Sequence, residues 1–251
     1  MGHVGDARSQ TGIGGTPAPT GRATFSPEIP LATRYNGWVL ETVKPFVGRS
    51  VVEVGFGHGS VRARLDPDVR YVGLDLDAGV IEQARREDPS GVYAVADICQ
   101  TDLRSLVPLP DADTVLCVNV IEHIAEDGIA TTNLLDLLAS GGYLVLFAPA
   151  LPRLYNDLDR LAGHYRRYRK RELAALIPPN RASVVRLHYF NPIGAVGWWL
   201  NGFAQHDSLD STRVGRQVRL FDRYAVPLSR LLDNLTRRWM GQSVLCVARR
   251  L

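Results

Sequence analysis

The sequence predicts an α/β protein built on a mostly parallel sheet. Short segments that are almost continuously apolar alternate with helical patterns, as is typical of strands buried on both faces. A glycine-rich turn directly follows the first strand segment, Val51–Val54. Strand–helix–strand connections of this kind are right-handed crossovers that bring the carboxyl ends of the parallel strands to one edge of the sheet. We therefore expect a ligand site at that edge.

The elements follow one another at short intervals. We expect a disordered tail over residues 1–24, which are rich in Gly, Ser, Thr and Pro, and then a single domain over 25–251. A helical pattern with Tyr35 and Trp38 on its apolar face begins at Leu31 and ends at Pro45. Five strands are then expected, over 50–54, 70–75, 92–96, 114–118 and 143–148, with helices between them. The first of these helices is expected to start at Val61 and to include Leu65. The second follows Asp77 as its N-cap and turns Val80, Ile81 and Ala84 toward the core. The third contains Leu134, Leu135 and Leu138 and ends at Gly141-Gly142.

Composition sets further limits. A chain of 251 residues can bury one substantial core, and it contains no apolar run of membrane-spanning length and no signal pattern at its start. We therefore expect a cytoplasmic protein, with Cys99, Cys117 and Cys246 reduced.

Residues 1–150 carry 11 basic and 19 acidic side chains, whereas 151–251 carry 18 basic and 7 acidic ones. The basic half either faces an anionic partner or lipid headgroups, or is a solvated arginine-rich surface.

Four successive strand ends carry glycine, acid or amide. The first is the alternating turn Gly55, Gly57 and Gly59, and the others are Asp75, Asp97 and Asn119. An acid after the second strand is suited to ribose hydroxyls, and Asp97 with Ile98 is suited to adenine. The ligand expected from these residues is a dinucleotide or S-adenosylmethionine.

The turn favours the second ligand. A dinucleotide fingerprint has its third glycine at the sixth position, which is Ser60 here. The buried acid Glu53 before the turn suits a cationic ligand better than a pyrophosphate, and S-adenosylmethionine carries an ammonium and a sulfonium. We predict that the cofactor is bound by Tyr35, Glu53, Gly55, Phe56, Gly57, Asp75, Leu76, Asp97, Ile98 and Asn119.

With these motifs in order, the sequence resembles a class I S-adenosylmethionine-dependent methyltransferase. The matching segments are 52–59, 72–77, 96–98 and 118–124, and the resemblance covers about 34–177. It implies a seven-stranded, Rossmann-like sheet with a reversed last strand, for which 183–189 and 243–248 are the candidate sixth and seventh strands. The subgroup that it resembles most is that of small-molecule, ubiquinone-type enzymes.

That subgroup raises the question of a metal. Some of its members carry Glu-x-x-Glu-His after the fourth strand and bind a divalent cation there. Glu122 and His123 match this pattern, but Asn119 replaces the first acid. Because the loss of an anionic ligand weakens a site for a hard cation, we expect no metal.

The acceptor is expected beyond the fifth strand. Methyl transfer from a sulfonium needs the nucleophile in line and water excluded, and it needs a base only if the acceptor holds a proton. His164 is the candidate base, and the candidate acceptor-binding residues are Tyr155, Tyr165, Arg166, Tyr168 and Trp198. Arg166 or Arg167 would clamp a carboxylate or phosphate. The alternative is a solvated helix start whose tyrosines pack on the sheet.

Between the last two expected strands lies an insertion, 191–240. Its first part is apolar and aromatic, and its second part places apolar residues on one helical face, interrupted by Pro227: Val214, Val218, Phe221, Ala225, Leu228, Leu232, Leu235 and Trp239. A lid over a hydrophobic acceptor, a dimer surface and a membrane-surface contact are the three interpretations, and we prefer the lid.

Together these patterns predict methyl transfer to a small-molecule hydroxyl, amine or carbon, in secondary-metabolite, quinone or glycolipid biosynthesis. The expected product of the cofactor is S-adenosylhomocysteine, and the expected state is a monomer or homodimer without nucleic acid. The alternatives are a nicotinamide-dependent Rossmann oxidoreductase and a non-catalytic relative that binds the same cofactor.

Overall fold

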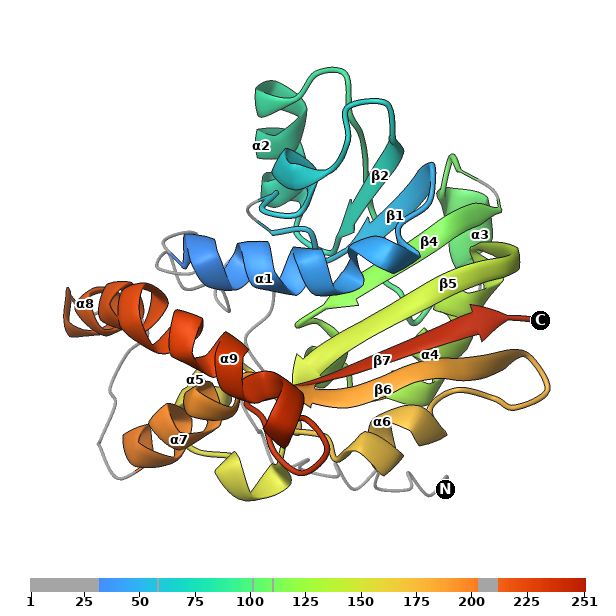
Figure 1. The fold of residues 1–251 in the computed structure, drawn as a ribbon. Helices are drawn as coiled ribbons and strands as arrows, with labels where there is room; N and C mark the ends of the chain where they lie inside the picture. Colours follow the sequence, from blue (N-terminus) through green and yellow to red (C-terminus); the bar gives the residue numbers. More distant parts are fainter. Residues whose placement is uncertain (1–31, 58, 101, 110, 203–211) are drawn as a thin grey trace, which may run out of the picture.

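Seven strands form one mixed sheet in the order β3-β2-β1-β4-β5-β7-β6 (Figure 1). The computed structural model describes residues 32–57, 59–100, 102–109, 111–202 and 212–251, so the predicted tail over 1–24 lies outside them. β1 to β5 run parallel, whereas β7 is antiparallel to both β5 and β6. The predicted fold class, with its reversed last strand, is confirmed. The strands are β1 Ser50–Val54, β2 Arg70–Asp75, β3 Val92–Val95, β4 Ala112–Val118, β5 Leu138–Pro149, β6 Ala182–Phe190 and β7 Ser243–Arg250.

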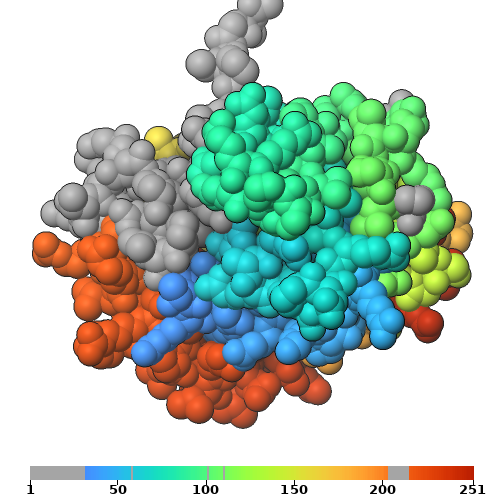
Figure 2. Space-filling model, turned by 90° about the horizontal axis from the view of Figure 1, so that it is seen from above, coloured from blue at the N-terminus to red at the C-terminus, as the bar shows by residue number. Residues whose placement is uncertain are grey.

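Helices cover both faces of the sheet and form two hydrophobic cores. One core includes residues of α3, α4 and α6, and the other includes residues of α1, α2 and α9. Seen from above, α1 lies between the part of the chain around α2 and the insertion helix α8 (Figure 2). The helices are α1 Thr33–Val43, α2 Ala78–Glu87, α3 Leu103–Leu106, α4 Asp127–Asp136, α5 Asp157–Leu161, α6 Lys170–Ala175, α7 Pro192–Asn201, α8 Thr212–Leu220 and α9 Val226–Thr236.

Two of the expected helix positions are corrected. Asp77 caps α2 as predicted, with its side chain accepting from the backbone N–H groups of Gly79 and Val80. Over 61–65, however, only a 3₁₀ turn forms, Arg62–Arg64, because Pro67 and the restricted residue before it stop a longer helix. Helix α4 ends at Asp136, and Gly141-Gly142 lies inside β5, where Leu138 already pairs with Ala112.

The insertion between β6 and β7 folds into α7, α8 and α9, with a π-helical turn, Phe221–Ala225, joining α8 to α9. Its predicted apolar face is only partly buried. Val218 and Phe221 line the cavity described below, but Leu228, Leu235 and Trp239 are 51%, 69% and 72% exposed. The residues that α9 buries are instead Val226, Ser229 and Asp233, because polar contacts to the rest of the insertion set the rotation of this helix.

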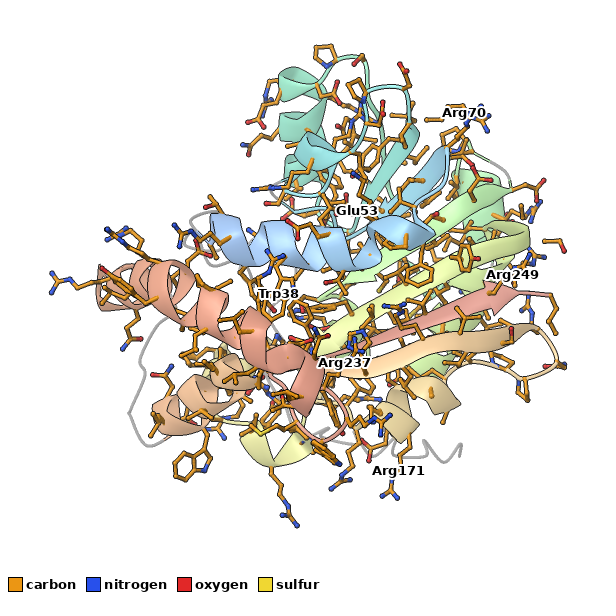
Figure 3. The ribbon with its side chains drawn as sticks, in the orientation of Figure 1. Trp38, Glu53, Arg70, Arg171, Arg237 and Arg249 are labelled. Atoms are coloured by element: carbon orange, nitrogen blue, oxygen red, sulfur yellow. The ribbon has the colours of Figure 1, made fainter. Side chains whose placement is uncertain are left out.

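Aromatic rings attach the insertion to the sheet. Phe190, at the end of β6, is fully buried, and its ring centroid lies 3.9 Å from that of Trp38 and 5.3 Å from that of Phe147. Trp38 extends from α1 toward α9, whose Arg230 guanidinium lies 5.9 Å from the Trp38 ring (Figure 3). Phe190 therefore joins β5, α1 and the start of the insertion in one packed cluster.

We expect Phe190→Ala to lower the free energy of unfolding by roughly 3–5 kcal/mol, since it removes a buried ring and leaves a cavity. Urea denaturation measures this change. The matched control is Val184→Ala, at a 40% exposed position of the same strand, which should cost less than about 1 kcal/mol. Equal losses in the two variants would contradict this account of the packing.

Candidate functional site

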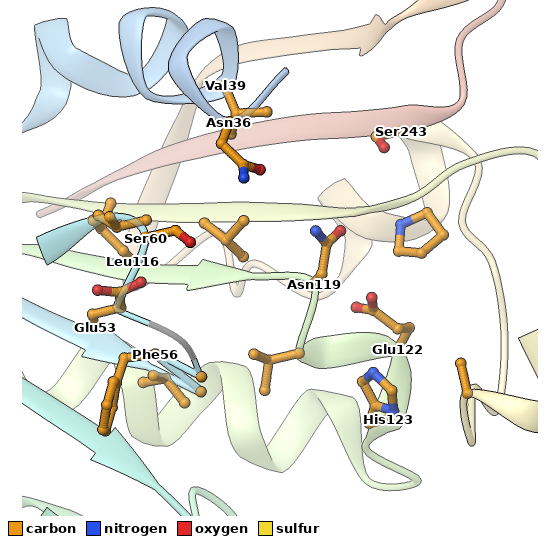
Figure 4. A pocket seen from close by; sticks show the side chains of 18 of the residues that line it. Asn36, Val39, Glu53, Phe56, Ser60, Leu116, Asn119, Glu122, His123 and Ser243 are labelled. Carbon is orange, nitrogen blue, oxygen red and sulfur yellow. The ribbon is translucent and has the colours of Figure 1, made fainter. Parts of the chain in front are cut away.

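The carboxyl edge of the sheet opens into a cavity of about 550 Å³. In Figure 4, Glu53 and Phe56 lie at one end, Glu122 and His123 at the other, and Asn119 between them. All ten residues predicted to bind the cofactor line this cavity, as do His164 and Trp198. The structure thus brings together side chains from β1, β2, β4, α1, α7 and the loops that follow the strands.

The glycine turn forms the wall at the first end. Gly55 and Gly57 have φ values of 64° and 53°, in the left-handed region where other residues are strained. A Cβ at Gly55 would also lie 2.3 Å from Cγ2 of Val120. Glycine is therefore required at position 55 both by backbone conformation and by the close approach of the chain after β4.

Carboxylates surround this end of the cavity. Glu53 is 4% exposed and accepts a 2.5 Å hydrogen bond from the Tyr71 hydroxyl. Burial raises the pKa of Glu53 to about 8, and the Tyr71 hydrogen bond only partly offsets this effect. Burial likewise raises the pKa of Asp75, whose Oδ1 accepts from the backbone N–H of Asp77. Asp97 Oδ1 accepts from the backbone N–H of Cys99.

This end fits S-adenosylmethionine chemically. A cation beside Glu53 would relieve the cost of its buried charge, and Asp75 and Asp97 can accept from hydroxyl and amino groups. Phe56 and Ile98, both buried, offer apolar surface to a ring. Individual roles of the ten residues remain predictions.

At the opposite end of the cavity, His164 is held by Asp159. Nδ1 of His164 lies 2.8 Å from Oδ1 of Asp159. Although burial acts to raise it, the pKa of Asp159 is lowered below its ordinary value by the hydrogen bond with His164 and by the guanidinium of Arg167. An ionised Asp159 favours the tautomer with its proton on Nδ1 and leaves the Nε2 lone pair directed away from Asp159.

Glu122 and His123 lie beside the His164 ring. Nε2 of His164 lies 3.9 Å from Oε1 of Glu122, and the rings of His123 and His164 meet edge to face with centroids 4.7 Å apart. Both Glu122 oxygens and Nδ1 of His123 are buried without a hydrogen-bond partner in the part of the chain that the structure describes. Burial raises the pKa of Glu122 to about 7 and lowers that of His123 to about 4. Three acceptors converge here, and a proton, a cation or a donor group of a ligand would satisfy them.

The predicted acceptor-binding residues divide into two groups. Trp198 lines the cavity, and its indole Nε1–H donates to Asp159 Oδ2 at 3.3 Å. The other four are absent from the lining. Tyr155 supports the backbone of His164, Tyr165 is half exposed, Arg166 pairs with Asp127, and Tyr168 is buried against the Ile121 carbonyl and Asp127.

Sequence reasoning missed other lining or supporting residues. Asp159 is one, although its position as third residue of α5 after the Asn156 cap could have suggested a capping box. Asn36, Gln242 and Ser243 also line the cavity, and no local motif distinguishes them. They meet the site only because α1 and the start of β7 converge at this edge of the sheet.

The fold is that of S-adenosylmethionine-dependent methyltransferases, and the cavity fits S-adenosylmethionine chemically. Residues 52–146, which are less than half of the chain, match the family model described as "Methyltransferase domain". The chain is 29% identical to an uncharacterised methyltransferase of Mycobacterium tuberculosis (strain ATCC 25618 / H37Rv) over 128 residues, which are 50% of this chain and 63% of that relative. The match to trans-aconitate 2-methyltransferase of Azoarcus sp. (strain BH72) is 25% identical over 160 residues, or 62% of this chain and 56% of that enzyme.

Solved structures share the fold. Geranyl diphosphate C-methyltransferase from Streptomyces coelicolor A3(2) superposes with a TM-score of 0.57 at 14% identity, covering 86% of this chain and 77% of that one. A methyltransferase of Archaeoglobus fulgidus gives 0.54 at 15% identity, covering 85% and 94%. These similarities concern the architecture, and the resemblance to the ubiquinone-type subgroup stays a prediction.

Binding of S-adenosylhomocysteine should tighten as pH rises toward about 8. Its ammonium favours ionised Glu53, and below the raised pKa of Glu53 binding must displace a proton, at a cost of up to about tenfold in affinity per pH unit. Calorimetric titration across this range measures the effect. Glu53→Gln should flatten the pH dependence, and Glu41→Gln, at an exposed ion pair, should preserve it. A pH-dependent slope that survives in Glu53→Gln would contradict the assignment.

The end of the cavity lined by Glu122, His123 and His164 also bears on the prediction that the protein binds no metal. The ligand atoms of Glu122, His123 and His164 all lie within 4.8 Å of one another, a grouping that can hold a metal ion. We nevertheless expect no stoichiometric metal, because Glu122 is the one carboxylate of the three and a metal would have to displace its proton below about pH 7. Elemental analysis and Zn²⁺ titration test this expectation. Tight Zn²⁺ binding that Glu122→Gln abolishes would overturn it.

Proposed function

We propose that this protein transfers a methyl group from S-adenosylmethionine to a small, largely apolar acceptor through a hydroxyl or amine. The observation that carries the proposal is the Asp159–His164 pair at the end of the cavity opposite Glu53 and Asp75. A paired imidazole is needed when the acceptor must lose a proton, and it has no evident use in a protein that only holds the cofactor. Two matched proteins whose names state small-molecule substrates support the size class.

The charge of the cavity restricts the acceptor further. Among the described residues that line it, Arg167 is the only arginine or lysine, and its guanidinium is bonded to Asp159 and to the carbonyl of Ala150. The neighbouring Arg166 pairs with Asp127. Neither guanidinium is therefore available as the clamp for an acceptor carboxylate or phosphate. An acceptor that is uncharged around its reacting atom fits these surroundings best.

When bound, S-adenosylmethionine supplies an activated methyl group on a sulfonium. His164 accepts the proton of the acceptor at Nε2 as the oxygen or nitrogen of the acceptor bonds to the methyl carbon. The cofactor, held at the end of the cavity lined by Glu53 and Asp75, would keep the electron pair of its carbon–sulfur bond and become S-adenosylhomocysteine. Asp159 stabilises the resulting imidazolium and orients its ring. Glu122, with its raised pKa, can take that proton onward.

The insertion over 191–240 would act as the lid of this site. Trp198 of α7, Val218 of α8 and Phe221 of the π-helical turn all contribute to the cavity wall. Their contribution supports the exclusion of water from the sulfonium, which methyl transfer requires.

The experiment begins with isotope-labelled S-adenosylmethionine and a panel of phenols, alcohols, amines and carboxylic acids. With an accepted substrate, His164→Ala should lower kcat by roughly 10²–10⁴-fold while S-adenosylhomocysteine affinity stays unchanged, because His164 acts on the acceptor's proton. His188→Gln is the matched control, since His188 lies on β6 away from the cavity. Unchanged turnover in His164→Ala would refute the role of His164, and a stabilising shift with NAD⁺ but not S-adenosylhomocysteine would refute the cofactor.

A further inference from the structure

The outer surface of α8 and α9 exposes large apolar side chains. Leu231 and Leu235 of α9 are 75% and 69% exposed, and Trp239, just beyond the helix, is 72% exposed. Neighbouring α7 also exposes Val196 and Leu200. We call this surface the α8–α9 apolar face, and its members are Leu220, Tyr224, Leu228, Leu231, Leu235 and Trp239. Leucine and tryptophan clustered at this exposure normally mark a contact surface.

The charges that α8 and α9 themselves expose have one sign, and the nearby exposed acid Glu41 of α1 is paired with Arg230 of α9. The exposed arginines of the face include Arg216, Arg219, Arg223 and Arg238. The only acids between 212 and 240 are Asp222 and Asp233, and both are buried and turned inward. Asp222 accepts from the backbone N–H groups of Arg34 and Tyr35, and Asp233 accepts from that of Asn191. The acidic side chains are thus used in anchoring the insertion, while the exposed charges of the described part of α8 and α9 are positive.

We propose that the α8–α9 apolar face binds an anionic lipid surface. Leucine and tryptophan side chains beside exposed arginines are the composition by which helices lie in the headgroup region of a membrane. A second copy of this chain fits less well, because a two-fold interface would bring the same arginines of both copies together. The described residues contain no helix long and apolar enough to cross a membrane, so the contact is peripheral.

The position of the face connects it with the cavity. Val218 and Phe221 line the cavity from the same continuous helical segment that presents Leu220 and Tyr224 outward. A lipid-soluble acceptor delivered at this surface would need to pass only one layer of helix. This connection rests on the proposed function, whereas the surface contact itself does not.

The test is cosedimentation of the full chain with vesicles of phosphatidylcholine alone and of phosphatidylcholine mixed with phosphatidylglycerol. We expect binding to the mixed vesicles only, and weakening by added salt. Leu231→Glu with Leu235→Glu should weaken binding tenfold or more, and Arg216→Ala and Arg219→Ala should each weaken it roughly fivefold. Ile129→Glu is the matched control, because Ile129 is a half-exposed aliphatic residue of α4, which packs on the other face of the sheet. It should bind like the unaltered chain.

Circular dichroism and S-adenosylhomocysteine binding confirm that each variant is folded, and they also separate a failure of this proposal from a failure of the cofactor assignment. Equal binding to both vesicle types would overturn the role of the arginines, and no binding to either would overturn the proposal. Inorganic phosphate should not compete at matched ionic strength; competition would indicate a site for free phosphate. A dimer in light scattering that Leu231→Glu with Leu235→Glu dissociates, without vesicle binding, would assign the face to a second copy.

Discussion

The acceptor end of the cavity depends on one buried carboxylate. Asp159 accepts hydrogen bonds from the His164 ring and the Arg167 guanidinium, both in the loop between α5 and α6, and from the Trp198 indole of α7. A buried carboxylate is costly unless it is paired, and these donors keep its pKa low. The Asp159 carboxylate therefore orients the candidate base His164, pairs with the Arg167 guanidinium and, through Trp198, attaches the insertion to the site. Its loss would disturb all three at once.

The insertion is attached to the domain by a second set of buried polar groups. Asp222 caps the start of α1, which has no capping side chain of its own, across 188 residues of sequence. Asn191, held at a φ of 64°, accepts from the hydroxyl of Ser229 and donates to the side chain of Gln242. Because these bonds are buried, they set which face of α9 turns inward and leave its leucines outward. The wall of the cavity and the exposed apolar face are two sides of the same arrangement.

The residues expected to bind the cofactor could largely be predicted because the sequence patterns that indicate them are local. Strand boundaries at Ser50–Val54 and Arg70–Asp75 agree with the apolar pattern, and the residue after each parallel strand must lie at the carboxyl edge. Local patterns failed where pairing at a distance competes with them. Leu138 has the spacing of a helix with Leu134 and Leu135, yet it pairs with Ala112 in the sheet. The outward rotation of Leu228 and Leu235 was likewise invisible, since hydrophobic periodicity locates an apolar face but not what covers it.

The sequence by itself determined the fold class and the ranges of the first two strands, and it predicted the cofactor, because hydrophobic periodicity, glycine placement and strand-end acids are properties of short segments. It also singled out His164, Glu122 and His123 as separate candidates. Only the tertiary structure decided that Asp159 holds His164, that Glu122 lies near its other ring nitrogen while His123 packs against its ring, and that Arg166 and Tyr168 pair with Asp127 instead of lining the cavity. The physical reason is that buried charges must find partners, and which partners are within reach depends on how distant segments pack.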